Sequence, residues 1–160
     1  MGQGSTRREF LRGAASIAPA AALVSSGAGA ATPPVPDPHE RRVLPGPPDR
    51  PFSRAVVFDR TVHVSGALGR DPRTGELPAD FAAQCRIVFE QLEQAVVAAG
   101  SSMARVLKCT CFLTDAADFA AMNELFREYF PESPPARSTV VVKELVLAGA
   151  RVEIDCIAAL

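Results

Sequence analysis

The chain has 160 residues, which suits one domain and a tail, and with 48% hydrophobic and 22% charged residues it can bury a core. Its formal net charge is −1, and without residues 1–30 there are 14 basic against 17 acidic side chains, or −3. This weak acidity argues against a surface for nucleic acid or anionic membranes, although one buried arginine still recognises a small carboxylate.

The first thirty residues carry the features of an export signal in the usual order. Residues 6–12 match the twin-arginine pattern, in which two arginines and a variable residue precede Phe-Leu and a basic residue. A weakly apolar run over 13–24 is too short for a spanning helix, and residues 28–30 supply a small-x-small cleavage site. We predict a twin-arginine signal peptide over 1–30, a periplasmic or secreted protein, and no stable membrane association after cleavage. The alternative is an amphipathic N-terminus that is kept.

Residues 31–50 are predicted to form a proline-rich linker. The run from Thr32 to Pro51 holds eight prolines, counting Pro51, and such a run forms neither a helix nor a central strand. His39, in the middle of this run, is interpreted as a solvated linker residue.

After Phe52 the pattern becomes regular and predicts one α+β domain over residues 51–160. Asp80 is suited to cap the first helix, whose apolar stripe runs to Gly100, and three prolines stop the second helix. The predicted elements are strand 55–58, strand 61–64, helix 81–100, strand 106–113, helix 118–130, and a final hairpin of strands 138–142 and 151–158. This order, β-β-α-β-α-β-β, places two helices on one face of a mixed sheet.

The second face of this sheet also needs cover, because the strand at 106–113 is apolar on both sides. No predicted helix is left to supply that cover. Counting faces therefore predicts that another subunit packs there.

Four cysteines are predicted to be buried free thiols. Cys109 and Cys111 point the same way from one strand and are too far apart to bridge, Cys85 lies on a helical apolar stripe, and Cys156 lies in the apolar last strand. A zinc site is not expected, because the chain has no Cys-x-x-Cys pair and both histidines are distant from the cysteines in sequence.

Three features are candidates for chemistry. Ser65-Gly66 ends the second predicted strand, where a glycine allows a ligand to approach the backbone. Arg137 is either an ordinary surface arginine at a loop end or a bidentate clamp for a carboxylate. Glu153 either faces water in an alternating strand or lies in an interface cleft, where desolvation suits it to proton transfer. Asp155 shares the face of Glu153 and ranks second, and His63 is interpreted as an exposed strand residue.

A series of short motifs in order resembles the Rid (reactive intermediate deaminase) family. The resemblance covers about 110 residues, nearly the whole predicted domain, and the motifs are Pro51-Phe52-Ser53, Val64-Ser65-Gly66, Asp71-Pro72-Arg73-Thr74-Gly75-Glu76, Asn123, Pro135-Ala136-Arg137-Ser138 and Val152-Glu153-Ile154. The order of several motifs is far more specific than any one of them.

The resemblance implies a chorismate-mutase-like fold, a homotrimer with active sites between subunits, and hydrolysis of amino-acid-derived enamines and imines, of the 2-aminoacrylate and 2-iminopropanoate type, to 2-oxo acids and ammonia. It implies that Arg137 grips the substrate carboxylate and that Glu153 positions and activates water. The residues implied to line the pocket are Phe52, Ser65, Gly66, Asn123 and Thr139.

Two positions depart from the family pattern, since Phe52 stands where a tyrosine is common and Thr139 where a cysteine is common. Imine hydrolysis demands only positioning and acid–base help, so no metal or organic cofactor is expected. A second hypothesis remains open, in which the chain is a non-catalytic trimer that binds small carboxylates or hydrophobic clients.

Overall fold

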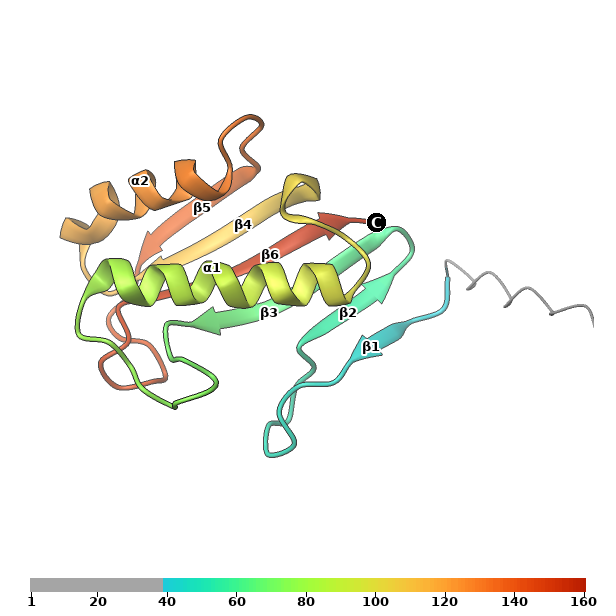
Figure 1. The fold of residues 1–160 in the computed structure, drawn as a ribbon, viewed down its shortest axis with the longest axis horizontal. Coiled ribbons are helices and arrows are strands. Elements are labelled where there is room, and N and C mark those ends of the chain that lie inside the picture. The colour runs from blue at the N-terminus through green and yellow to red at the C-terminus, as the bar shows by residue number, and fades with distance from the viewer. Residues whose placement is uncertain (1–38) are drawn as a thin grey trace, which may run out of the picture. The chain divides into compact units, whose positions relative to one another are not determined.

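Short β-branched and apolar runs form the strands of the computed structural model, and two segments of helical periodicity form its helices (Figure 1). The model describes residues 39–160. In chain order its elements are β1 (Arg42–Leu44), β2 (Ala55–Phe58), β3 (Thr61–Leu68), α1 (Phe81–Ala98), η1 (Met103–Arg105), β4 (Val106–Leu113), η2 (Ala116–Asp118), α2 (Phe119–Tyr129), β5 (Ala136–Val141) and β6 (Val152–Ala159). The predicted order of elements is confirmed, with β1 added before it.

The six strands form one mixed sheet in the order β1-β2-β3-β6-β4-β5, in which only β4 and β5 run parallel. The prediction that the last two strands form a hairpin is wrong, because β4 lies between β5 and β6. The reason is the helical crossover through α2, which returns the chain parallel to β4 on its outer edge. The last strand then pairs with the inner edge of β4.

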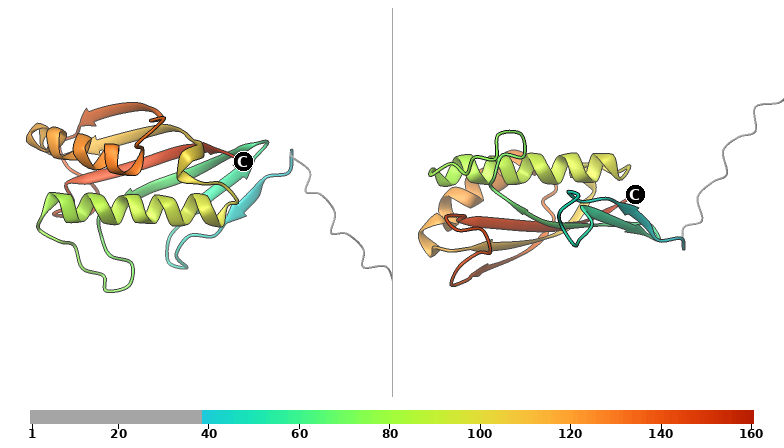
Figure 2. Two further views of the ribbon diagram at one scale, coloured as in Figure 1. Left: turned by 45° about the horizontal axis from the view of Figure 1, so that its top comes forward. Right: turned by 90° about the horizontal axis from the view of Figure 1, so that it is seen from below.

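Both helices cover the same face of the sheet, as predicted, and the views in Figure 2 show α1 and α2 on one side of it. The residues of β6 alternate accordingly: Val152, Ile154, Cys156 and Ala158 are buried at 0–2% exposure, while the residues between them are half-buried. The predicted cap of α1 is confirmed, since the Asp80 carboxylate accepts a 2.8 Å hydrogen bond from the Ala83 amide.

The opposite face of the sheet carries no helix in the described part of the chain. Large apolar side chains remain exposed there, among them Val43 at 40%, Phe58 at 46% and Val140 at 45%. Strand register places all three on this side. Each pairs with a residue of the neighbouring strand whose next residue along that strand faces the helices, and successive residues of a strand point to opposite faces. We call this side the open face.

The sheet is larger than the sequence pattern indicated: it has one additional edge strand, and one predicted strand is longer. Arg42–Leu44, within the predicted linker, pair with β2 as an edge strand, which is possible because the six residues between the prolines at 38 and 45 include no proline. In addition, β3 does not end at Ser65-Gly66 but continues to Leu68, with a register shift against β6 between Val64 and Ala67.

A buried polar network ties the N-terminal part of α1 to the segment before β6. Gln84, fully buried, donates hydrogen bonds to the carbonyls of Pro78 and Gly149 at 2.7 and 3.1 Å and accepts one from the Arg151 amide at 2.9 Å. The Arg151 guanidinium forms a two-pronged ion pair with Asp118, which is 6% exposed. These contacts satisfy polar groups that burial would otherwise leave unpaired.

The prediction of four buried free thiols is confirmed for Cys85, Cys109, Cys111 and Cys156. Burial raises the pKa of each thiol, that of Cys111 to about 11, so none carries thiolate character near neutral pH.

The predicted export signal, residues 1–30, lies outside the described residues. Among residues 39–160, neither helix combines the length and the apolarity that crossing a membrane requires.

Candidate active site

Arg137 lies near the start of β5 on the helix-covered face of the sheet. Its register partner on β4 is Cys109, which is fully buried, so both side chains point toward the helices. The guanidinium donates a 2.6 Å hydrogen bond to Asn123 Oδ1 and lies 4.6 Å from the ring centroid of Phe126 and 5.6 Å from that of Phe119. These three α2 residues recur at helical spacing and form one surface that orients the guanidinium. Within residues 39–160 no carboxylate pairs with it, which leaves donors of its fork for an anion.

Thr139 lies two residues further along β5, on the same face as Arg137. Its hydroxyl oxygen is buried and has no hydrogen-bond partner of normal geometry in the described structure. The register partner of Thr139 on β4 is Cys111, which offers only a weakly polar thiol. A buried hydroxyl without a partner is costly, so a ligand atom or a water molecule suits this position. We call Arg137, Asn123 and Thr139 the arginine half-site.

Glu153 lies on β6 and points to the open face, because Val152 and Ile154 on either side of it are fully buried under the helices. Its carboxylate rests on the backbone of Gly66, where a methyl group would lie 2.0 Å from Glu153 Oε1. Burial raises the pKa of Glu153, and the nearby Asp155 carboxylate raises it further. The glycine is thus needed for close approach, as the sequence suggested, although it lies inside β3 rather than at its end.

Ser65 is next to Gly66 on β3, and Phe52 lies in the segment before β2 and lines the same cavity as both residues. The Ser65 hydroxyl donates a 2.7 Å hydrogen bond to the carbonyl of Ser53, and Phe52 is 51% exposed. We call Glu153, Gly66, Ser65 and Phe52 the glutamate half-site. It joins residues that lie far apart in the sequence.

The two half-sites do not meet within one protomer. Arg137 and Glu153 point to opposite faces of the sheet, and β4 lies between their strands. The predicted convergence of these two residues therefore requires that they come from different subunits.

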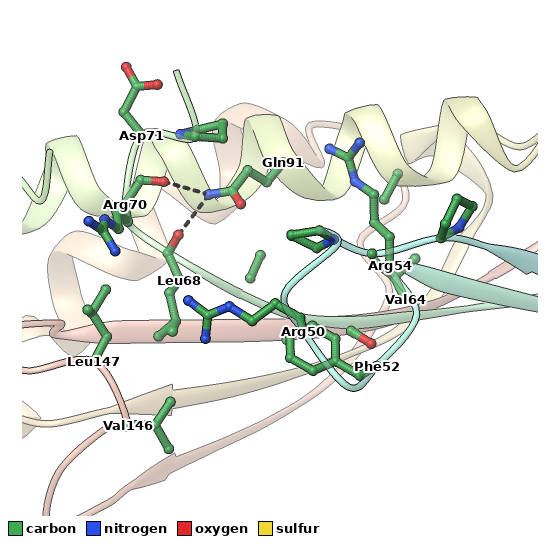
Figure 3. Close-up of a pocket in the computed structure, with 18 of the residues that line it drawn as sticks. Arg50, Phe52, Arg54, Val64, Leu68, Arg70, Asp71, Gln91, Val146 and Leu147 are labelled. Atoms are coloured by element: carbon green, nitrogen blue, oxygen red, sulfur yellow. Dashed lines mark hydrogen bonds between the residues drawn. The ribbon is translucent and has the colours of Figure 1, made fainter. Parts of the chain in front are cut away.

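A cavity of about 790 Å³ adjoins the glutamate half-site and includes Phe52, Ser65 and Gly66 in its lining (Figure 3). It lies between the segment before β2, the end of β3, the turn that follows β3, and residues 146–147 of the connection before β6. Gln91 on α1 holds one wall in place with hydrogen bonds to the carbonyls of Leu68 and Arg70, at 2.7 and 3.2 Å.

Comparison with known proteins assigns this arrangement to a family. A family model described as Endoribonuclease L-PSP matches residues 45–160, which is more than half of the chain. The chain belongs to the L-PSP family, also called the Rid family. The resemblance that the motifs indicated is therefore confirmed.

Individual L-PSP proteins are similar over most of this domain. A Capra hircus protein named 2-iminobutanoate/2-iminopropanoate deaminase is 39% identical over 109 residues, covering 68% of this chain and 79% of that protein. Crystal structures of RidA from an Antarctic Psychrobacter and of Escherichia coli TdcF with bound serine are 41% and 34% identical, each with a TM-score of 0.68. They cover 73% and 79% of this chain and 94% and 97% of those chains. These neighbours confirm the chorismate-mutase-like fold.

Three cavity residues of this L-PSP protein were not found by sequence reasoning, namely Arg50, Arg54 and Arg70. They lie in a proline-rich stretch, just before a strand and in a turn, where no periodicity shows which side chains share a space. Other polar candidates lie elsewhere: His63 is exposed on β3, as predicted, and His39 contacts Asp59 at 3.4 Å. No group of metal-binding side chains occurs in the described part of the chain.

Proposed function

We propose that this L-PSP protein hydrolyses imines and enamines derived from amino acids, of the 2-iminopropanoate and 2-aminoacrylate type, to 2-oxo acids and ammonia. The observation that carries the proposal is the pair of half-sites: an oriented arginine that has no carboxylate partner among residues 39–160, and a carboxylate of raised pKa that rests on a glycine. The similarity to a protein named as an imine deaminase supports the reaction, and a relative solved with bound serine supports a ligand of amino-acid size.

In the proposed mechanism, Arg137 binds the substrate carboxylate through two parallel N–H donors. The Glu153 carboxylate takes a proton from water as the water oxygen attacks the imine carbon, and the C=N electron pair moves to nitrogen, which is protonated. Collapse of the resulting carbinolamine breaks the C–N bond, releases ammonia and forms the 2-oxo group. An enamine substrate first takes a proton at carbon and gives one up from nitrogen to become the imine.

We propose further that the active site forms between protomers of a homotrimer. Two observations support an assembly: the half-sites lie on opposite faces of each sheet, and the open face exposes Val43, Phe58 and Val140. Val140→Lys, which places a charge in this apolar surface, is expected to shift the protein toward monomer in analytical ultracentrifugation and to abolish turnover. A wild-type protein that sediments as a monomer would contradict the assembly.

Trapping of the imine tests the reaction directly. An amino acid oxidase generates 2-iminopropanoate in the presence of semicarbazide, and the wild-type protein is expected to lower the amount trapped. Arg137→Ala is expected to lose this effect, whereas Arg127→Ala, which removes an exposed arginine of α2, keeps it. Equal trapping with and without the wild-type protein would contradict the reaction.

Glu153→Gln distinguishes the enzyme from a carboxylate-binding module. The variant is expected to retain binding of pyruvate, measured by calorimetry, and to lose the acid–base contribution to turnover, about 10²–10⁴-fold. Wild-type protein that binds pyruvate through Arg137 without accelerating hydrolysis would favour the binding module. Unchanged turnover in Glu153→Gln would remove this carboxylate from the mechanism.

We also propose that the chain is exported through the twin-arginine route, on the basis of residues 6–12. Replacement of Arg7 and Arg8 by lysine is expected to leave a tagged protein in the cytoplasm, whereas the unaltered chain appears in the periplasmic fraction. Equal export of both forms would contradict this route.

A further inference from the structure

The cavity beside the glutamate half-site carries an excess of positive charge. Three arginines, Arg50, Arg54 and Arg70, line it together with a single acidic residue, Asp71. That carboxylate is already engaged by Arg73, through the backbone amide at 2.8 Å and the guanidinium at 3.4 Å. The cavity is therefore basic although the whole chain carries a net charge of −1.

Two of the guanidiniums come from the segment before β2 and the third from the turn after β3, and they have few partners of opposite charge within the described residues. Arg54 turns to α1 and donates a 3.2 Å hydrogen bond to Gln94, a neutral group. Arg70 uses its Nε on the carbonyl of Gly75 at 2.6 Å, which leaves its two terminal nitrogens. Arg50 contacts only the carboxylate of its neighbour Asp49, at 3.8 Å, within the described residues.

Arg50 and Arg70 are the two arginines suited to share one ligand. Both line the cavity, and in Figure 3 they are drawn on either side of Leu68, with the Arg50 side chain extending toward Leu68. Arg70 is exposed, and its backbone is held by Gln91 of α1, which donates a hydrogen bond to the Arg70 carbonyl. Among the described residues, neither guanidinium pairs with a carboxylate from another segment. Such guanidiniums can bind a carboxylate or another small oxyanion.

The cavity is larger than a small imino acid requires. At about 790 Å³ it falls within the range of roughly 300–1,000 Å³ that encloses drug-sized ligands. Glu153 does not itself line the cavity but contacts Gly66, which does, so a three-carbon imine held at Glu153 would reach only the part of the cavity near Gly66. The remaining space extends toward Arg50 and Arg70.

We infer that the preferred substrate carries a second acidic group on its side chain, as the imine of a dicarboxylic amino acid does, and that Arg50 and Arg70 bind this group. The inference rests on the proposed function, because it assumes that the imine carbon lies at Glu153 and the first carboxylate on Arg137. Hydrolysis itself is unchanged: water supplies the oxygen, the C–N bond breaks and ammonia leaves.

The test compares 2-iminosuccinate with 2-iminopropanoate, each generated in situ by an oxidase acting on the parent amino acid. Wild-type protein is expected to show the higher kcat/KM for 2-iminosuccinate. In the double variant Arg50→Gln, Arg70→Gln the ratio of the two kcat/KM values is expected to fall by about tenfold or more, the effect of losing charge-assisted hydrogen bonds. Arg60→Gln, an exposed arginine of the β2–β3 turn that does not line the cavity, keeps the wild-type ratio, and Arg50→Lys restores part of it.

A binding measurement separates failure of this inference from failure of the proposed reaction. Succinate is expected to bind wild-type protein more tightly than butanoate, and the double variant to lose that preference, even if neither imine is hydrolysed. A preference that survives in the double variant overturns the inference while the deaminase proposal stands. An altered oligomeric state with no change in preference also overturns it, and assigns these arginines to contact with a second copy of the chain.

Discussion

The two faces of the sheet differ in how they are completed. On the helix-covered face, alternate residues of β6 are buried at 0–2% exposure under α1 and α2, so one protomer suffices to close the core. On the open face, the other residues of β6 are half-buried and apolar side chains such as Phe58 and Val140 remain exposed. Stability is therefore built on one face, whereas the candidate chemistry depends on what covers the other.

Each half-site also reflects the face on which it lies. Arg137 points toward α2, and its guanidinium is oriented within the protomer by Asn123 and the Phe126 ring. Glu153 lies on the open face, where, among residues 39–160, its side chain rests against Gly66 and its backbone is held in β6. In the proposed mechanism, the arginine that binds the substrate carboxylate is therefore already oriented within the protomer, whereas the surroundings of Glu153 would be completed by the proposed assembly.

Gly69→Ala gives the largest expected effect on the helix-covered face. A methyl group at this position would lie 2.5 and 2.8 Å from Cβ and Cα of Gln84, so α1 itself must move. Overpacking against a helix backbone is expected to lower the free energy of unfolding by about 3 kcal/mol, measured by urea denaturation. A urea concentration at the unfolding midpoint close to that of the wild type would show that α1 is not fixed at this contact.

Asp118→Asn is expected to have the next largest effect, because it breaks the ion pair with Arg151 beneath the same helices. We expect a loss of roughly 2 kcal/mol in the free energy of unfolding, since Asp118 is buried while Arg151 is partly exposed. Glu128→Gln is the matched control, because it breaks the exposed pair with Arg86 and is expected to change the stability far less. Equal losses in the two variants would contradict the role of burial.

The amino-acid sequence determines the helix-covered face almost completely. The stripe of α1, its Asp80 cap and the alternation of β6 are local patterns, and each forms the predicted element. Strand neighbours are a different matter, since they depend on the crossover through α2, which no local pattern encodes. For this reason the predicted final hairpin was wrong although its two strands were present.

The open face and the cavity are less predictable from sequence. Arg137 and Glu153 stand out because a charged residue interrupts or precedes an apolar strand, and a family resemblance strengthens that signal. Arg50 and Arg70 lie in irregular segments, so only the folded chain shows that they line one cavity.

Gly66→Ala is the counterpart of Gly69→Ala on the open face. Its methyl group meets only the end of the Glu153 side chain, which can move away at little cost in stability. Displacement of the carboxylate is expected to lower kcat/KM by about tenfold or more while the unfolding midpoint stays near the wild-type value. If this variant unfolds at a lower urea concentration than the wild type and keeps its activity, the assignment of stability to one face and of chemistry to the other is wrong.

Asp155→Asn gives the smallest expected effect and tests the electrostatics of the open face. Burial is the main cause of the raised pKa of Glu153, and repulsion from Asp155 is the second cause. In the proposed mechanism Glu153 is a general base and acts in its deprotonated form, so activity is expected to fall as pH falls through its pKa, at a higher pH than for an ordinary carboxyl group. Removal of the neighbouring charge lowers that pKa, and the acid limb of kcat/KM is expected to move to lower pH by less than about one unit.

Asp155→Glu keeps the charge and is expected to leave the acid limb of the pH profile in place. A limb that stays fixed in Asp155→Asn would mean that burial alone sets the pKa, or that another group controls the acid side of the profile.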